Sequence, residues 1–228
     1  MTPELAALAR EVTACRRCPR LVAWRERVAD EKRAAYRSET YWGRPVPGFG
    51  DPAARLLIVG LAPAAHGANR TGRMFTGDRS GDWLYAALHR AGFANHAAST
   101  HRDDGLALHG AYVTAVVRCA PPANKPTPAE RDACRPFLER ELDLLPELRV
   151  VVCLGNFSYA QTLRILAARG LPPPRPRPRF AHGLELELGG RLHLLASYHP
   201  SQQNTFTGRL TREMFDAVWA RAARLADG

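Results

Sequence analysis

Five cysteines carry the strongest chemical signal in this sequence. Cys15 and Cys18 form a CxxC motif, and Cys119 and Cys134 could supply two further thiolates. Four thiolates can hold either a tetrahedral zinc ion or an iron–sulfur cluster. The second pair lies 15 positions apart, unlike the paired CxxC knuckles of a zinc ribbon, so the spacing leaves zinc, a cluster and a coincidental CxxC open. Cys153 lies inside an apolar run and is predicted to be a core residue.

A long polar loop at residues 61–81 is the second such feature. It carries Phe75, an aromatic that could anchor the loop or stack on a nucleic-acid base. It also carries Asp78, a carboxylate that could act on a substrate or only cap a helix. Its glycines have the GxxxxG spacing of a phosphate-binding loop, but Arg73-Met74 follows where Lys and Ser or Thr are needed. A structureless loop of this length is more often functional than not, so we expect a ligand site rather than a nucleotide hydrolase.

One of the histidines, His199, begins a His-Pro-Ser turn directly after an apolar run. A lone histidine is usually only a satisfied polar residue. However, loops 61–81, 118–126 and 198–204 each follow a predicted strand, and ligands bind outside the carboxyl ends of parallel strands. The three loops should therefore meet at one sheet edge, which favours a functional His199.

The elements that must position these residues follow from the apolar pattern. Short β-branched runs predict buried strands, and amphipathic stretches between them predict helices, one opening with a capping box at Thr127 to Glu130. This alternation predicts an α/β fold, a three-layer α/β/α sandwich around a four-stranded parallel sheet, as a single domain over residues 1–228. We expect strands at Arg55 to Gly60, Tyr112 to Val117, Val150 to Leu154 and Leu192 to Ser197, and helices at Asp82 to Ala91, Thr127 to Leu145, Phe157 to Ala168 and Thr211 to Ala226.

The charge balance points to a polyanionic partner. The chain has 32 Lys and Arg against 22 Asp and Glu, a net charge of +10, and a basic surface binds phosphates by releasing counterions. A solvated arginine-rich surface is the alternative, and it also applies to the arginines of the proline-rich segment 171–180, predicted to be an extended loop. No apolar run has the length of a membrane span and no secretory signal is visible. We therefore expect a cytoplasmic protein without membrane contact or structural disulfides.

Three segments together resemble the motifs of family 5 of the uracil-DNA glycosylase superfamily. They are residues 60–78, residues 117–128 and residues 197–205. The resemblance extends from Cys15 to the last helix, and the long first motif is specific. It implies a four-stranded parallel sheet and a [4Fe–4S] cluster that ties the N-terminal segment to the domain. The implied cluster ligands are Cys15, Cys18, Cys119 and Cys134.

The resemblance also implies roles for individual residues. The reaction would hydrolyse the bond between a damaged base and deoxyribose after the base is flipped out of the duplex. His199 would donate a hydrogen bond to the base oxygen, and Phe75 would stack on the base. The remaining implied base-binding residues are Gly60, Leu61, Ala62, Ala115 and Asn204.

Two departures from related families matter. Other families place a carboxylate or amide where this chain has Leu61 and Ala62, so the water-positioning group must lie elsewhere. Asp78 matches the carboxylate proposed for that role in family 5, and Asn124 is a second candidate. Ala115 stands where family 4 relatives carry a base-reading Asn, which predicts weak discrimination between bases.

We therefore expect a monomeric DNA glycosylase that removes uracil and other deaminated bases from DNA and initiates base excision repair. A uracil-only enzyme of family 4 type is the nearest alternative. A non-catalytic, metal-bearing nucleic-acid-binding module is the rival from another class. An electron carrier is disfavoured, because it would need neither the long loop nor His199.

Overall fold

The computed structural model describes residues 2–189 and 191–228, and within these ranges six strands form one sheet. The four predicted strands are confirmed as a parallel core in the order β3-β2-β4-β6. Two shorter strands, which the sequence did not predict, pair antiparallel to its edges, β1 beside β3 and β5 beside β6. The strands are β1 (Phe49–Gly50), β2 (Leu56–Gly60), β3 (Ala111–Ala115), β4 (Val150–Leu154), β5 (Glu185–Glu187) and β6 (His193–Ser197).

The central strands are apolar along their whole length because both faces of the sheet are covered. Every residue of β2, β3 and β4 is buried. Alternate side chains enter two separate cores: Leu56 and Ile58 pack in one, and Leu57 and Val59 in the other. This two-residue period is that of a pleated strand, and it defines the two outer layers.

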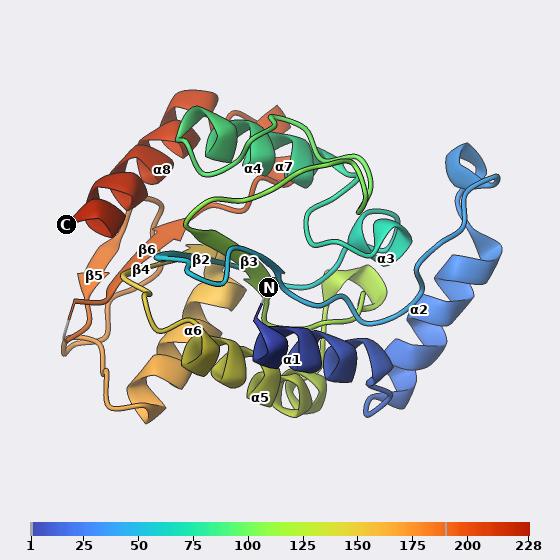
Figure 1. Ribbon diagram of the computed structural model, residues 1–228, viewed down its shortest axis with the longest axis horizontal. Helices are drawn as coiled ribbons and strands as arrows, with labels where there is room; N and C mark the ends of the chain where they lie inside the picture. The colour runs from blue at the N-terminus through green and yellow to red at the C-terminus, as the bar shows by residue number, and fades with distance from the viewer. Residues whose placement is uncertain (1, 190) are drawn as a thin grey trace.

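Helices cover both faces, so the predicted three-layer sandwich is confirmed (Figure 1). The first core packs against α4 and α8, and the second against α1, α5 and α6. The Thr127–Glu130 capping box forms at the start of α5 as predicted. No helix in the described ranges is long and apolar enough to cross a membrane. The helices are α1 (Pro3–Ala14), α2 (Pro19–Glu31), α3 (Ala68–Thr71), α4 (Arg79–Arg90), α5 (Pro128–Leu144), α6 (Asn156–Ala168), α7 (Gln202–Phe206) and α8 (Arg212–Asp227), with 3-10 turns η1 (Ala34–Tyr36) and η2 (Pro122–Asn124).

Candidate functional site

The predicted site residues gather at the carboxyl edge of the sheet. Gly60 ends β2 and is the register partner of Ala115, which ends β3. The ring of Phe75 lies 5.9 Å from that of His199, centroid to centroid, with 31° between their planes. The first and last predicted motifs therefore meet, and they leave two rings at the position expected for a flipped base.

Two glycines leave the space that the Phe75 ring and backbone occupy. A Cβ added to Gly60 would lie 2.7 Å from the Phe75 ring, and one added to Gly81 would lie 1.8 Å from the Phe75 carbonyl oxygen. Phe75 itself has a φ of 52°, a left-handed conformation that costs a non-glycine residue about 1–3 kcal/mol. The Tyr85 hydroxyl donates to the neighbouring Met74 carbonyl at 2.7 Å. Helix α4 thus helps to hold a strained loop in place, as is typical of functional sites.

His199 is held by its backbone, which leaves its ring for a ligand. Its carbonyl accepts hydrogen bonds from the Asn204 side chain at 2.8 Å and from the Ser201 amide at 2.8 Å. Within the described ranges the imidazole has no hydrogen bond. Burial lowers the pKa of His199 to about 4, so at neutral pH the half-buried ring is uncharged and carries one N–H donor. The Asn204 amide nitrogen, expected to contact the base, is engaged with His199; its role toward a base stays a prediction.

A second histidine, which sequence reasoning missed, fixes the same turn. His182 Nδ1 accepts from the Tyr198 amide at 3.2 Å, which places the proton on Nε2, 3.2 Å from the Met214 carbonyl. Its ring also stacks on Tyr198 at 5.2 Å. Burial lowers the pKa of His182, so this tautomer is neutral and ties the turn before His199 to α8. A lone histidine distant in sequence from the motif gave no signal of this role.

Asp78 caps α4, as the alternative to a catalytic role had predicted. It also faces the backbone of the loop at residues 61–81, which we call the motif loop. Its Oδ1 accepts from the Gly81 amide at 3.0 Å. A Cβ added to Gly67 would lie 2.0 Å from Oδ2, so the second oxygen lies against the loop backbone. No ion pair joins Asp78 to an arginine in the part of the chain described here. Burial raises the pKa of the Asp78 carboxyl above its ordinary value.

The other site residues occupy more peripheral positions. Leu61 and Ala62 are half-buried directly after β2, and the Leu61 carbonyl accepts from the Val117 amide at 3.0 Å. Asn124 is exposed on η2 with a φ of 56°, and the structure brings its side chain into no hydrogen bond with Asp78 or His199.

The four predicted ligand cysteines line one small, enclosed cavity. Cys15 and Cys18 flank the junction of α1 and α2, Cys119 follows β3, and Cys134 lies in α5. Cys153 lies fully buried in β4, as predicted, and does not line this cavity. Across residues 2–189 and 191–228, no group of three or more His, Cys, Asp or Glu side chains is arranged to hold a single metal ion.

A buried cation adjoins this cavity. The Arg25 guanidinium donates to Cys119 Sγ at 2.9 Å and to the Cys15 carbonyl at 3.3 Å, while its Nε has no partner. Its nearest carboxylate, that of Glu26, lies 3.8 Å away and is partly exposed. Burial raises the pKa of Cys119 to about 11 and that of Cys134 to about 12. Without a bound metal these thiols would be neutral, and the buried Arg25 charge would face only the partly exposed Glu26 carboxylate at 3.8 Å.

The comparisons with known proteins agree with this geometry. A family model described as the Uracil DNA glycosylase superfamily matches residues 47–223. A Type-5 uracil-DNA glycosylase of Mycobacterium tuberculosis is 57% identical over 224 residues, 98% of this chain and 81% of the relative. Relatives of the same description are 57% identical in Thermus thermophilus (96% of this chain, 97% of the relative) and 47% in Pyrobaculum aerophilum (92% and 88%). The chain belongs to the uracil DNA glycosylase superfamily.

Proposed function

We propose that this chain is a uracil-DNA glycosylase, which hydrolyses the N-glycosidic bond of uracil in DNA and initiates base excision repair. The observation that carries the proposal is the meeting of Phe75, which lies against Gly60, with His199 at the carboxyl edge of the sheet. An aromatic face and a ring N–H donor are what an extruded pyrimidine needs, one for stacking and one for its carbonyl oxygen. The proposal includes a monomeric active unit that works in the cytoplasm.

His199 would stabilise the leaving group. As the glycosidic bond breaks, negative charge develops on the base and positive charge on the sugar. A preorganised donor aimed at the developing charge is the usual main source of catalysis. The low pKa of His199 means that the neutral imidazole donates this hydrogen bond, so no proton need be lost or gained by the ring at neutral pH.

Asp78 would act on the sugar side. Its Oδ1 accepts from the Gly81 amide, and its Oδ2, which lies beside Gly67, would accept a hydrogen bond from the attacking water. In its ionised form the carboxylate would also offset the positive charge on the sugar. Capping and catalysis are therefore compatible in one side chain. Asn124 is the less favoured candidate, because it is exposed on η2.

We extend the proposal to other deaminated bases. Ala115 lies beside Gly60 and offers a methyl group where a bidentate amide would select uracil. Excision of hypoxanthine and xanthine, measured beside uracil under single-turnover conditions, tests this range. The variant Ala115→Asn should raise the preference for uracil at least about tenfold. A wild-type enzyme already inert on both purines would restrict the activity to uracil.

We propose that Cys15, Cys18, Cys119 and Cys134 hold a [4Fe–4S] cluster. The shared cavity and the buried Arg25 guanidinium that donates to Cys119 Sγ support it, because four thiolates around an iron–sulfur core carry net negative charge. A cluster would link the N-terminal segment to the loop after β3 and to α5, with a structural role. Cys119→Ser should remove iron and the broad absorption near about 400 nm, whereas Cys153→Ser should retain both. A colourless wild type with stoichiometric zinc would contradict the cluster.

Release of free uracil from a uracil-containing duplex is the experiment that tests the function itself. The enzyme should leave an abasic site that alkali cleaves, and an undamaged duplex of the same sequence should remain intact. Tight DNA binding without release of base would instead identify a non-catalytic nucleic-acid-binding module.

A further inference from the structure

The connection between α4 and β3, residues 91–110, takes a longer path than its ends require. The end of α4 and the start of β3 both lie at the amino edge of the sheet, opposite the site. The middle of the connection nevertheless reaches the motif loop at the carboxyl edge, where the Gly77 amide donates to the Ser99 carbonyl at 3.1 Å. Loops of this length within a compact domain are usually functional.

A buried ion pair clamps the connection to the motif loop. The Arg73 guanidinium donates to Asp104 Oδ2 and to Ser99 Oγ, both at 2.6 Å, and to the Arg102 carbonyl at 3.2 Å. Burial opposes ionisation of Asp104, but the hydrogen bonds from Arg73 and from the Leu106 and Thr100 amides outweigh it and hold its pKa well below the ordinary value. The pair therefore stays charged and fixes the backbone on both sides of Arg102.

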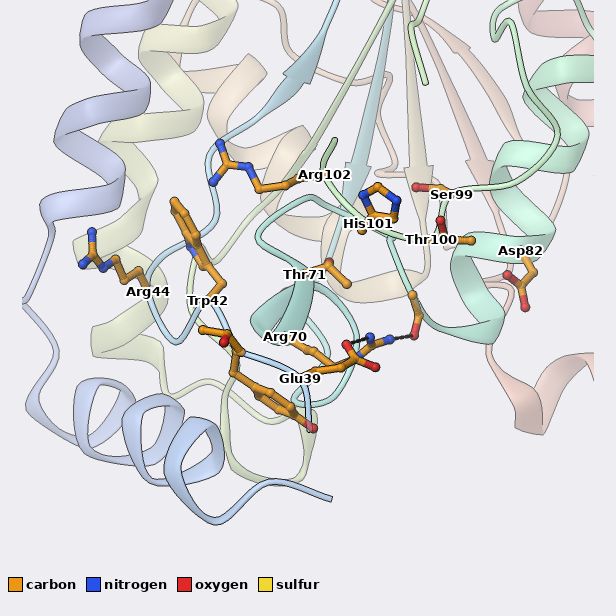
Figure 2. Close-up of a pocket in the computed structure, with 13 residues that line it drawn as sticks. Glu39, Trp42, Arg44, Arg70, Thr71, Asp82, Ser99, Thr100, His101 and Arg102 are labelled. Atoms are coloured by element: carbon orange, nitrogen blue, oxygen red, sulfur yellow. Dashed lines mark hydrogen bonds and ion pairs between the residues drawn. The ribbon is translucent and has the colours of Figure 1, made fainter. Parts of the chain in front are cut away.

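The clamp places Arg102 on an aromatic platform. Its guanidinium lies 4.6 Å from the Trp42 ring centroid, and that of Arg44 lies 5.9 Å from it. The indole N–H donates to the Pro45 carbonyl at 3.1 Å, and a Cβ added to Gly72 would lie 2.9 Å from the indole ring. Figure 2 shows Arg102 and Arg44 on two different sides of Trp42. We call Trp42, Arg44 and Arg102 the arginine ridge.

The ridge separates two grooves of about 800 and 890 Å³ and lines both. The first is lined by Gly77 and by Asp82 in the first turn of α4, the helix that Asp78 caps. Its other carboxylate, that of Glu39, is paired with Arg70. The second groove has a single carboxylate, that of Glu26, which is paired with Arg16, and five arginines: Arg10, Arg16, Arg25, Arg44 and Arg102.

The ridge charges themselves lack close counter-ions. Within the described ranges Arg44 has no carboxylate at ion-pair distance, and Arg102 has only the exposed Asp103 at 3.8 Å. A guanidinium that stacks on an aromatic face keeps its N–H donors in plane and available, and it is partly ordered before a ligand arrives. Such groups bind phosphate oxygens without reading sequence.

We propose that the arginine ridge binds the sugar–phosphate backbone of the DNA duplex that flanks the excised base. The inference rests on the proposed function for its choice of partner. The ridge adjoins the motif loop but contributes no group to the pair formed by Phe75 and His199. It therefore sets the affinity and the register of the duplex and leaves the cleavage step unchanged.

The test compares two double variants that lose the same charge. Arg44→Ala/Arg102→Ala removes the ridge guanidiniums, and Arg191→Ala/Arg224→Ala removes two exposed arginines from the opposite edge of the sheet. Binding to a uracil-free duplex is measured by fluorescence anisotropy at several salt concentrations, and cleavage of a uracil duplex at saturating enzyme. In the ridge variant, the plot of log affinity against log salt should be less steep by about 1.8, the value for two phosphate contacts. The variant should cleave within about twofold of wild type.

Two results would overturn the proposal. A ridge variant with the wild-type slope would show that these arginines do not meet phosphates. An equal loss in both double variants would show an effect of net charge alone. If the wild type bound DNA but released no uracil, the proposed function would fail, while the slopes would still decide the role of the ridge.

Discussion

Asp78 and His199 stand at the same sheet edge but are held in opposite ways. Asp78 is engaged through its side chain, as the cap of α4, whereas His199 is engaged through its backbone and keeps its ring for a ligand. Burial acts against charge in both, raising the pKa of the carboxyl and lowering that of the imidazole. Asp78 caps the N-terminus of α4, and the positive end of that helix favours its charged form. In the proposed mechanism this difference would place the anion on the sugar side and the neutral donor on the base side.

Removal of the donor should have the largest effect. His199→Ala should lower single-turnover release of uracil by about 10²- to 10³-fold, because one preorganised donor to the developing charge is lost. DNA affinity should change little, since the ring contributes mainly in the transition state. His89→Ala, an exposed histidine in the last turn of α4, is the matched control. Normal cleavage by a folded His199→Ala protein would remove this residue from the mechanism.

Loss of the Asp78 charge should have the next largest effect. Asp78→Asn should slow cleavage on the order of 10²-fold with little change in melting temperature, since Asn caps a helix about as well as Asp. Asp82→Asn, which removes an exposed charge from the same helical turn, should cleave at the wild-type rate. A wild-type rate in Asp78→Asn would transfer the water-positioning role to Asn124.

A smaller effect is expected from the residue that positions His199. Asn204→Ala removes one hydrogen bond to the His199 carbonyl, a contribution of about 1 kcal/mol, and should slow cleavage by about five- to tenfold. The dissociation constant for DNA should stay near that of wild type. Gln203→Ala, at an exposed position in the same short helix, is the control. A weakened DNA affinity with an unchanged rate would instead place Asn204 in direct contact with the substrate.

The parts of the fold that the sequence predicted are those with long, regular apolar patterns. The four parallel strands and the helices α4, α5, α6 and α8 are of this kind. Strands β1 and β5 have two and three residues, too few to show a period. Helix α1 was missed although Leu5, Leu8 and Val12 are spaced for one buried face behind a Thr2 cap, so its signal was present in the sequence.

The site was predictable where it depends on loops that follow strands. Phe75 and His199 were expected at one edge because the carboxyl ends of parallel strands meet there. The positions of Arg25 and His182 were not predictable, because each acts through a partner distant in sequence: Cys119 for Arg25 and Tyr198 for His182.

The pH dependence of single-turnover uracil release tests the contrast between Asp78 and His199 most directly. An ionised Asp78 and a neutral His199 require the rate to fall as pH drops through the raised pKa of the carboxyl, and to be flat at all higher pH values up to the alkaline range. The acid limb should disappear in Asp78→Asn and persist in His199→Ala. A rate that fell as pH rose through about 6 to 8, with that limb lost in His199→Ala, would show a protonated histidine at work and would contradict the account.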